Sequence, residues 1–192
     1  MNRIFYPMAL LAVVAVTAVL GLGLYLHTFN VRDAADLEAQ RLATVHRLTG
    51  IAAGVIVLLV DSVVVTYFVG TSRWCKEVSE TYRLAPTLVA RSNQLKRKTF
   101  PLAVVSMLIL VGIVALGGAA DPATDLHPAP LQQLFGADIS WADAHLAGAL
   151  IGTALVAYGF FAMAQNIASN QIVIQDVMTE VKRIRTERGL EV

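Results

Sequence analysis

Residues 48–70 read LTGIAAGVIVLLVDSVVVTYFVG, and Asp61 is the only acid or base in this run. A helix of about 20 apolar residues crosses the roughly 30 Å hydrocarbon core of a bilayer. In lipid, only a helix or a closed barrel satisfies every backbone polar group. The run therefore predicts a transmembrane helix, and this prediction decides the fold class.

Three further stretches have the same character, at residues 6–25, 100–119 and 146–168, and none of them has an acid or base in its interior. The first follows a short basic start with Arg3, as a secretory signal would. Its apolar run is too long for a signal, however, and no small-x-small cleavage site follows it. The sequence thus predicts an all-α integral membrane four-helix bundle that forms one membrane domain over residues 1–192.

The composition of the chain excludes a soluble globular protein. Of 192 residues, 56% are hydrophobic and 15% are charged, and the mean hydropathy is +0.63. A soluble domain of this size could not bury so many apolar side chains in one core. The near balance of 15 basic and 14 acidic residues gives no sign of a nucleic-acid partner, and the single cysteine cannot form an internal disulfide.

Basic residues are unevenly divided between the two sides of the predicted membrane. Twelve of the fifteen lie at the N-terminus, between the second and third spans, or after the fourth span. They are Arg3, Arg73, Lys76, Arg83, Arg91, Lys96, Arg97, Lys98, Lys182, Arg183, Arg185 and Arg188. The other side has only Arg32, Arg41 and Arg47. Because cytoplasmic loops carry the excess of Lys and Arg, we expect both termini in the cytoplasm, and in a bacterium we expect the plasma or inner membrane.

The two halves of the chain resemble each other. At an offset of 94 residues, Arg3, Tyr6, Pro7, Met8, Ala9, Leu22 and Gly23 fall on Arg97, Phe100, Pro101, Leu102, Ala103, Leu116 and Gly117. At an offset of 99, His46 falls on His145. These matches predict a duplicated transmembrane hairpin. Both copies would start inside, so equivalent residues would lie at equal depth.

The segments at about 72–99 and 169–188 are predicted to extend the bundle as cytoplasmic helices. In the second segment, apolar residues recur at helical spacing, and Gly189 is a stop signal. The apolar residues are Ile174, Val177, Met178, Val181 and Ile184. This stripe predicts packing against residues 87–98 of the same chain. The alternatives are a partner subunit or the membrane surface.

All four histidines fall on the predicted outer side: His27, His46, His127 and His145. Histidine is the usual axial ligand of b-type haem, and a haem between helices needs two imidazoles that face each other. If the repeat holds, His46 and His145 form such a pair. Small residues lie one and two turns further along each helix: Gly50, Gly54, Gly148 and Gly152. These glycines either leave room for a macrocycle or let helices approach closely. In the second case the histidines are interfacial residues at helix starts, and another metal is a further alternative to haem.

Asp61 is expected to face the bundle interior, because a charged acid in lipid is costly. Its expected polar neighbours are Ser62, Tyr158 and Ser106. Two roles are compatible with this position. Asp61 is either a proton relay or a protonated hydrogen-bonding strut between helices.

No catalytic set is apparent in the sequence. Cys75 has basic neighbours, but no histidine lies on its side to act as a base. Phosphate-binding loops, the His-Glu-x-x-His motif, serine nucleophile motifs and the Cys-x-x-Cys-His motif of c-type haem are all absent from the sequence. Three hypotheses follow: a non-catalytic subunit or accessory protein of a membrane complex, which has partner subunits or a second copy of itself; a haem b electron carrier that uses His46 and His145; and a proton-coupled transporter or channel that uses Asp61.

Overall fold

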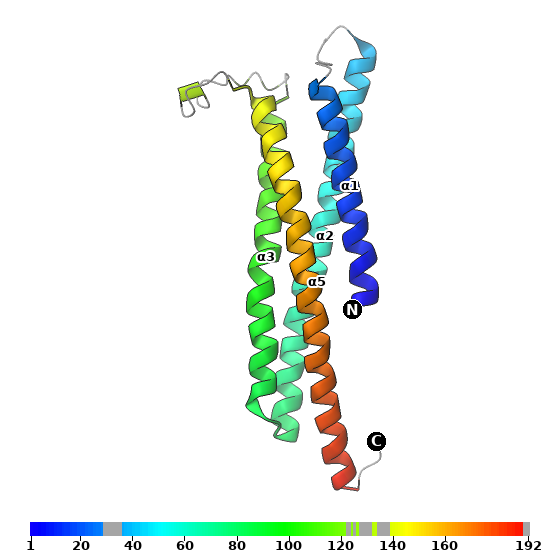
Figure 1. The fold of residues 1–192 in the computed structure, drawn as a ribbon, viewed down its shortest axis with the longest axis vertical. Coiled ribbons are helices and arrows are strands. Elements are labelled where there is room, and N and C mark those ends of the chain that lie inside the picture. The colour runs from blue at the N-terminus through cyan, green and yellow to red at the C-terminus, as the bar shows by residue number, and fades with distance from the viewer. Residues whose placement is uncertain (29–35, 122–123, 125, 127–131, 134–138, 190–192) are drawn as a thin grey trace.

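The computed structural model describes residues 1–28, 36–121, 124, 126, 132–133 and 139–189. In this part of the chain there are four long helices and no strand: α1 (Asn2–Thr28), α2 (Leu37–Tyr82), α3 (Pro86–Ala119) and α5 (Trp141–Glu187). Each is long and apolar enough to cross a membrane, and each contains one of the four predicted spans. The helices run up and down beside one another (Figure 1).

The helices form a closed ring. α1 packs on α2, α2 on α3, α3 on α5, and α5 on α1, while α2 and α5 also touch across the centre. We call the end at which α1 and α3 finish and α2 and α5 begin the outer end and the opposite end the inner end, after the orientation expected from the basic residues. α1 begins partway along the bundle, so that only α2, α3 and α5 continue to the inner end (Figure 1).

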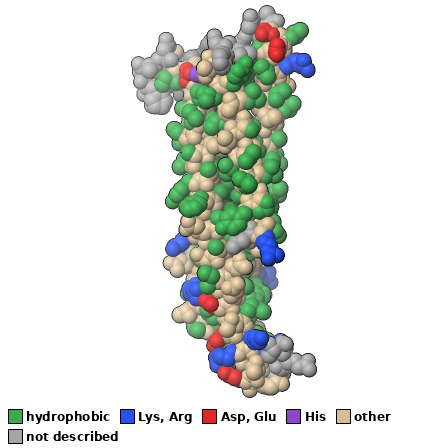
Figure 2. Space-filling view, turned by 45° about the vertical axis from the view of Figure 1, so that its right-hand side comes forward, with side chains coloured by type: hydrophobic (Ala, Val, Ile, Leu, Met, Phe, Trp, Pro, Cys, Tyr) green, Lys and Arg blue, Asp and Glu red, His purple; other side chains and the backbone are tan. Residues whose placement is uncertain are grey.

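The core of the bundle is apolar, and so is the surface around it. Val57 and Val64 of α2 are fully buried with Met163 and Ile167 of α5. Large apolar side chains that point away from the core stay exposed, among them Leu10, Leu59, Leu108 and Ile151. Figure 2 shows hydrophobic side chains over the central part and charged side chains gathered toward the two ends. Such a broad apolar band is the surface that a lipid environment favours.

One predicted helical segment is interrupted. Residues 72–99 are not one extension, because α2 ends at Tyr82 and α3 starts at Pro86. Arg83 adopts the left-handed conformation, with φ of 55°, and the backbone N–H of Leu84 donates to the carbonyl of Ser79. Pro86 opens α3 at a position where its missing N–H costs nothing. This turn lets α3 return antiparallel to α2.

The C-terminal part of α5 packs on its own chain. Val177 is fully buried in a cluster with Cys75 of α2 and Leu84 of the turn, and Val181 and Ile184 flank this cluster. The tail therefore contacts α2 as well as α3, which is a broader contact than the expected one with residues 87–98. Met178, predicted to belong to the buried stripe, is 53% exposed. After α5, Gly189 has a φ of 67°, in agreement with its predicted role as a stop signal.

Candidate functional site

Two histidines meet at the outer end of the bundle. His46 lies in the third turn of α2 and His145 in the second turn of α5, and these two helices lie diagonally opposite each other in the ring. The centroids of the two imidazole rings are 6.2 Å apart, and the ring planes cross at 78°. The structure thus brings together the two residues that the sequence analysis paired.

Each imidazole lies against a glycine of the neighbouring helix. A Cβ atom built on Gly23 of α1 would stand 2.8 Å from Cε1 of His46. The same atom on Gly117 of α3 would stand 3.0 Å from Cε1 of His145. Because any side chain at these two positions would push the imidazole away, the glycines create the space in which the rings lie.

The main chain also orients the rings. His145 Nδ1 lies 3.1 Å from the carbonyl oxygen of Ile113, and since a carbonyl only accepts, this nitrogen carries the proton. In a neutral imidazole, Nε2 then keeps a lone pair, which is the state of a histidine that binds a metal. His46 contacts the backbone of Val19, and its Nδ1 is buried without a hydrogen-bond partner.

The same set of contacts occurs in both hairpins. Gly23 and Val19 precede Gly117 and Ile113 by 94 residues, and His46 precedes His145 by 99. These are the two offsets at which the halves of the sequence match. In each hairpin, one helix supplies a glycine and a main-chain contact and the other supplies the imidazole.

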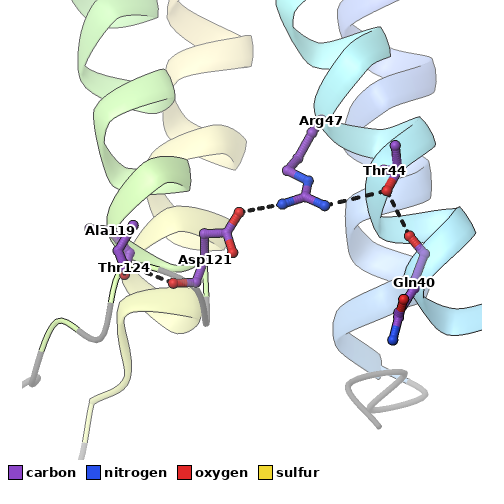
Figure 3. A network of polar contacts seen from close by, with 6 residues as sticks. All are labelled: Gln40, Thr44, Arg47, Ala119, Asp121 and Thr124. Atoms are coloured by element: carbon purple, nitrogen blue, oxygen red, sulfur yellow. Dashed lines mark hydrogen bonds and ion pairs between the residues drawn. The ribbon is translucent and has the colours of Figure 1, made fainter. Parts of the chain in front are cut away.

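Two polar contacts join the hairpins just outside the histidine pair. His27 Nε2, at the end of α1, donates to Asp143 Oδ1 at the start of α5 over 2.9 Å. Arg47 of α2 reaches Asp121, which follows α3, and also donates to Thr44 Oγ1 (Figure 3). No pattern in the sequence paired these residues, which lie 116 and 74 positions apart.

Asp143 precedes the predicted fourth span and closes a capping box with Ser140. Hydrogen bonds from the Ser140 hydroxyl and backbone N–H lower the pKa of Asp143 to about 2, and His27 adds to this effect. The carboxylate is therefore charged at neutral pH. The remaining histidine, His127, lies outside the described residues.

The four further glycines do not border an open space. Cβ atoms on Gly148 and Gly152 would collide with Leu116 and Ile113 of α3, at 2.8 and 2.5 Å. Gly54 lies against Leu110, and Gly50 lies against Val19. Of the two roles considered for these glycines, the structure shows close helix approach.

Two imidazoles are few ligands for a bare metal ion. The described residues contain no group of three or more His, Cys, Asp and Glu side chains that could hold one. Haem differs in this respect, because its macrocycle supplies four nitrogen ligands and leaves two axial positions for the protein. Of the cofactors considered, haem is therefore the one that requires only two ligands from the protein.

Asp61 lies in the bundle interior, as expected, and is fully buried. Neither carboxylate oxygen has a hydrogen-bond partner, although the hydroxyl of Ser106 on α3 lies nearby and is also unpaired. Two of the expected neighbours were wrong. Ser62 donates to its own helix at the carbonyl of Leu58, and Tyr158 is 65% exposed.

A buried polar network near the inner end was missed by the sequence analysis. Asn170 of α5 donates to the Tyr67 hydroxyl over 3.2 Å and to Thr71 Oγ1 over 3.0 Å, and it accepts from Ser92 over 3.4 Å. The sequence contained a pattern that could have indicated a polar helix face leading to this network. Ser92, Thr99 and Ser106 are spaced by seven residues and so lie on one face of α3.

Comparisons of this chain with protein-family models, with curated proteins and with solved structures find no match.

Proposed function

We propose that this chain is a non-catalytic integral membrane subunit that holds one b-type haem between His46 and His145. The main observation in its favour is the distance of 6.2 Å between the two ring centroids. Imidazole nitrogens bind a metal at about 2 Å, so two rings on opposite faces of one iron have centroids roughly 6 Å apart. Such a haem would carry electrons near the outer surface of the membrane to or from a partner subunit.

The environment of the rings supports this proposal. The hydrogen bond from Nδ1 of His145 to the Ile113 carbonyl leaves Nε2 available to iron. A second-shell carbonyl of this kind fixes the ring orientation of metal-binding histidines. The unpaired Nδ1 of His46 offers a lone pair or a proton inside the bundle.

We also propose that the two hairpins are copies of one ancestral hairpin. Besides the histidine contacts, buried positions coincide at the same offsets: Ala9 with Ala103, Val57 with Val156, and Val64 with Met163. The packing of α1 on α2 corresponds to that of α3 on α5, and the packing of α2 on α3 corresponds to that of α5 on α1. A duplication of this type places equivalent residues at equal depth, which accounts for two imidazoles that meet across the centre.

A second candidate is a subunit in which the histidine pair joins the hairpins without iron. Aromatic rings prefer edge-to-face contact at about 4.5 to 7 Å, and the observed 6.2 Å and 78° fall within this geometry. The aliphatic side chains against Gly148 and Gly152 favour this candidate, because they occupy space beside the pair.

The visible absorption spectrum of the purified protein separates the two candidates. Protein produced with haem available should show the bands of low-spin haem with two imidazole ligands, and reduction should sharpen them. His46→Ala and His145→Ala should each abolish this spectrum. His27→Ala is the matched control, because His27 lies at the same end and pairs with Asp143. Folded protein that shows no haem bands, even after haemin is added, would refute haem binding and leave the second candidate.

A further inference from the structure

We propose that Asp61 is a proton-binding group in the membrane interior that exchanges its proton with the inner end of the bundle along a polar stripe on α3. The stripe consists of Ser92, Thr99 and Ser106. This proposal does not depend on haem, because the residues lie on the other side of Asp61 from the histidine pair.

The immediate surroundings of Asp61 favour a bound proton. Val57, Val60 and Val64 flank it on α2 and are fully or almost fully buried. Buried polar groups in proteins are paired, with ordered water where no protein group is in reach. Asp61 and Ser106 both lack a partner. A protonated carboxyl can donate to the Ser106 hydroxyl, or to a water between them, whereas a carboxylate here would have no cation to balance it.

The stripe leads from Asp61 toward the inner end. Ser92, Thr99 and Ser106 are at most 2% exposed, and their spacing of seven residues corresponds to about 10 Å along the helix. At Ser92 the stripe joins the network of Asn170, Tyr67 and Thr71, which continues the polar lining. Ser72, bonded to Asn93, and the unpaired hydroxyl of Ser79 follow further toward the inner end. Intervening water would complete the proton path.

Between Asp61 and the histidine pair, the buried side chains are apolar, and they include Ala53, Val57, Leu110 and Val156. The next position of the seven-residue pattern on α3 is Ile113. The polar path therefore ends at Asp61 and opens only toward the inner end.

No other buried charge faces Asp61. Among the described residues, it is the only fully buried carboxyl or basic side chain. Ser106 of α3 lies nearby. The core cluster that includes Val57, Val60 and Val64, which flank Asp61 on α2, also contains Ala9 and Ala12 from α1, Ala103 from α3, and Phe160 and Met163 from α5. The proton affinity of the site is thus set by burial and by Ser106 rather than by an ion pair.

At the offsets of the proposed duplication, apolar residues take the place of this polar pair. Asp61 corresponds to Phe160 at the offset of 99, and Ser106 corresponds to Ala12 at the offset of 94. The interface of α1 with α5 therefore carries an apolar pair where that of α2 with α3 carries Asp61 and Ser106. Since an apolar pair serves one of two similar interfaces, a purely structural strut is the weaker explanation of Asp61.

Infrared spectroscopy of the full chain in phosphatidylcholine–phosphatidylglycerol vesicles tests the proposal. The carbonyl stretch of a protonated carboxyl should be present at neutral pH and should disappear in Asp61→Asn. Ser106→Ala should shift the band without removing it, which gives a second assignment should Asp61→Asn fail to fold. The rate at which the band shifts after transfer to heavy water reports proton exchange.

Thr99→Val removes one hydroxyl of the stripe and keeps the shape of the side chain. The loss of one hydrogen-bonding step should slow exchange by about tenfold. Thr49→Val is the matched control, because Thr49 also bonds to its own helix but is exposed near the outer end. Exchange at the wild-type rate in Thr49→Val supports the inner path. The absence of the band at neutral pH would overturn the proton site, and equal rates in the two threonine variants would overturn the path.

Discussion

Single atoms decide where the two imidazoles lie. At Gly23 and Gly117 the missing Cβ is what lets each ring approach the main chain of the neighbouring helix. The sequence already aligned these glycines between its halves and paired His46 with His145, at offsets of 94 and 99 residues. It could not predict that each glycine lies against a histidine, since this contact depends on how two helices are rotated about their axes.

We predict that Gly23→Ala and Gly117→Ala destabilise the protein. The new methyl group would stand 2.8 or 3.0 Å from Cε1 of an imidazole, so the ring or the helix must move. Overpacking costs typically 1 to 3 kcal/mol, and the better helix propensity of alanine offsets about 1 kcal/mol of this. Thermal unfolding followed by circular dichroism in detergent measures the balance.

The controls for this prediction are Gly21→Ala and Gly112→Ala. Both glycines lie in the same helices as the test positions, and nothing lies within 4 Å of a Cβ built on them. These variants should be as stable as the wild type or slightly more stable. Equal losses at all four positions would show that the imidazole contacts are not responsible.

We also predict an acid-sensitive outer end. The pKa of Asp143 lies near 2 in the folded protein against 3.8 ordinarily, chiefly because Ser140 donates to it. A carboxyl whose pKa is lowered by folding stabilises the protein fully above its unfolded value, and the stabilisation is lost as the pH falls through the folded value. The unfolding temperature of the wild type should therefore drop between about pH 4 and pH 2 more steeply than that of Asp143→Asn. Parallel curves for the two proteins over this range would contradict the prediction.

At the scale of whole elements, apolar length was a strong signal and helix ends were a weak one. All four predicted spans lie inside helices. The turn at residues 83–85 was missed because the left-handed residue is Arg83 and not a glycine, so that only Pro86 indicated the start of α3. In the tail of α5, the helical spacing placed Met178 in the predicted buried stripe. The residues that α5 packs against, Cys75 and Leu84, contact Val177 instead.

Substitutions at the adjacent residues Val177 and Met178 test whether the C-terminal part of α5 packs on α2 through Val177. Val177→Asp should loosen the inner end, because fully burying an apolar side chain of this size contributes about 1.5 to 3 kcal/mol and a buried charge adds a further cost. Met178→Asp should have little effect, because this neighbour is 53% exposed. Limited proteolysis of the two variants, read as cleavage within residues 169–188, measures the difference. Similar cleavage of both would show that the tail does not dock through Val177.

At the scale of the whole molecule, each long helix packs on two neighbours, and a ring of four helices results. The sequence could indicate the number of helices and which residues share a depth. It could not supply the contacts between the hairpins, such as Arg47 with Asp121, because the partners are distant in the chain and neither stands in a recognisable motif. The buried network around Asn170 was missed for a similar reason, since its members come from the three helices α2, α3 and α5.

The distribution of basic residues predicts how the molecule is oriented in the membrane. The end of α5 and the turn at residues 83–85 lie toward one end of the bundle, and α1 begins partway along it (Figure 1). Twelve of the fifteen basic residues of the sequence lie at the N-terminus, between the second and third spans, or after the fourth span. Because Lys and Arg flanking spans are retained in the cytoplasm, a reporter that is active only in the cytoplasm should be active when it is fused after Val192. The same reporter inserted after Thr124, at the outer end, should be inactive. A reporter pair with the opposite pattern in stably inserted protein would reverse the orientation, and the histidine pair would then face the cytoplasm.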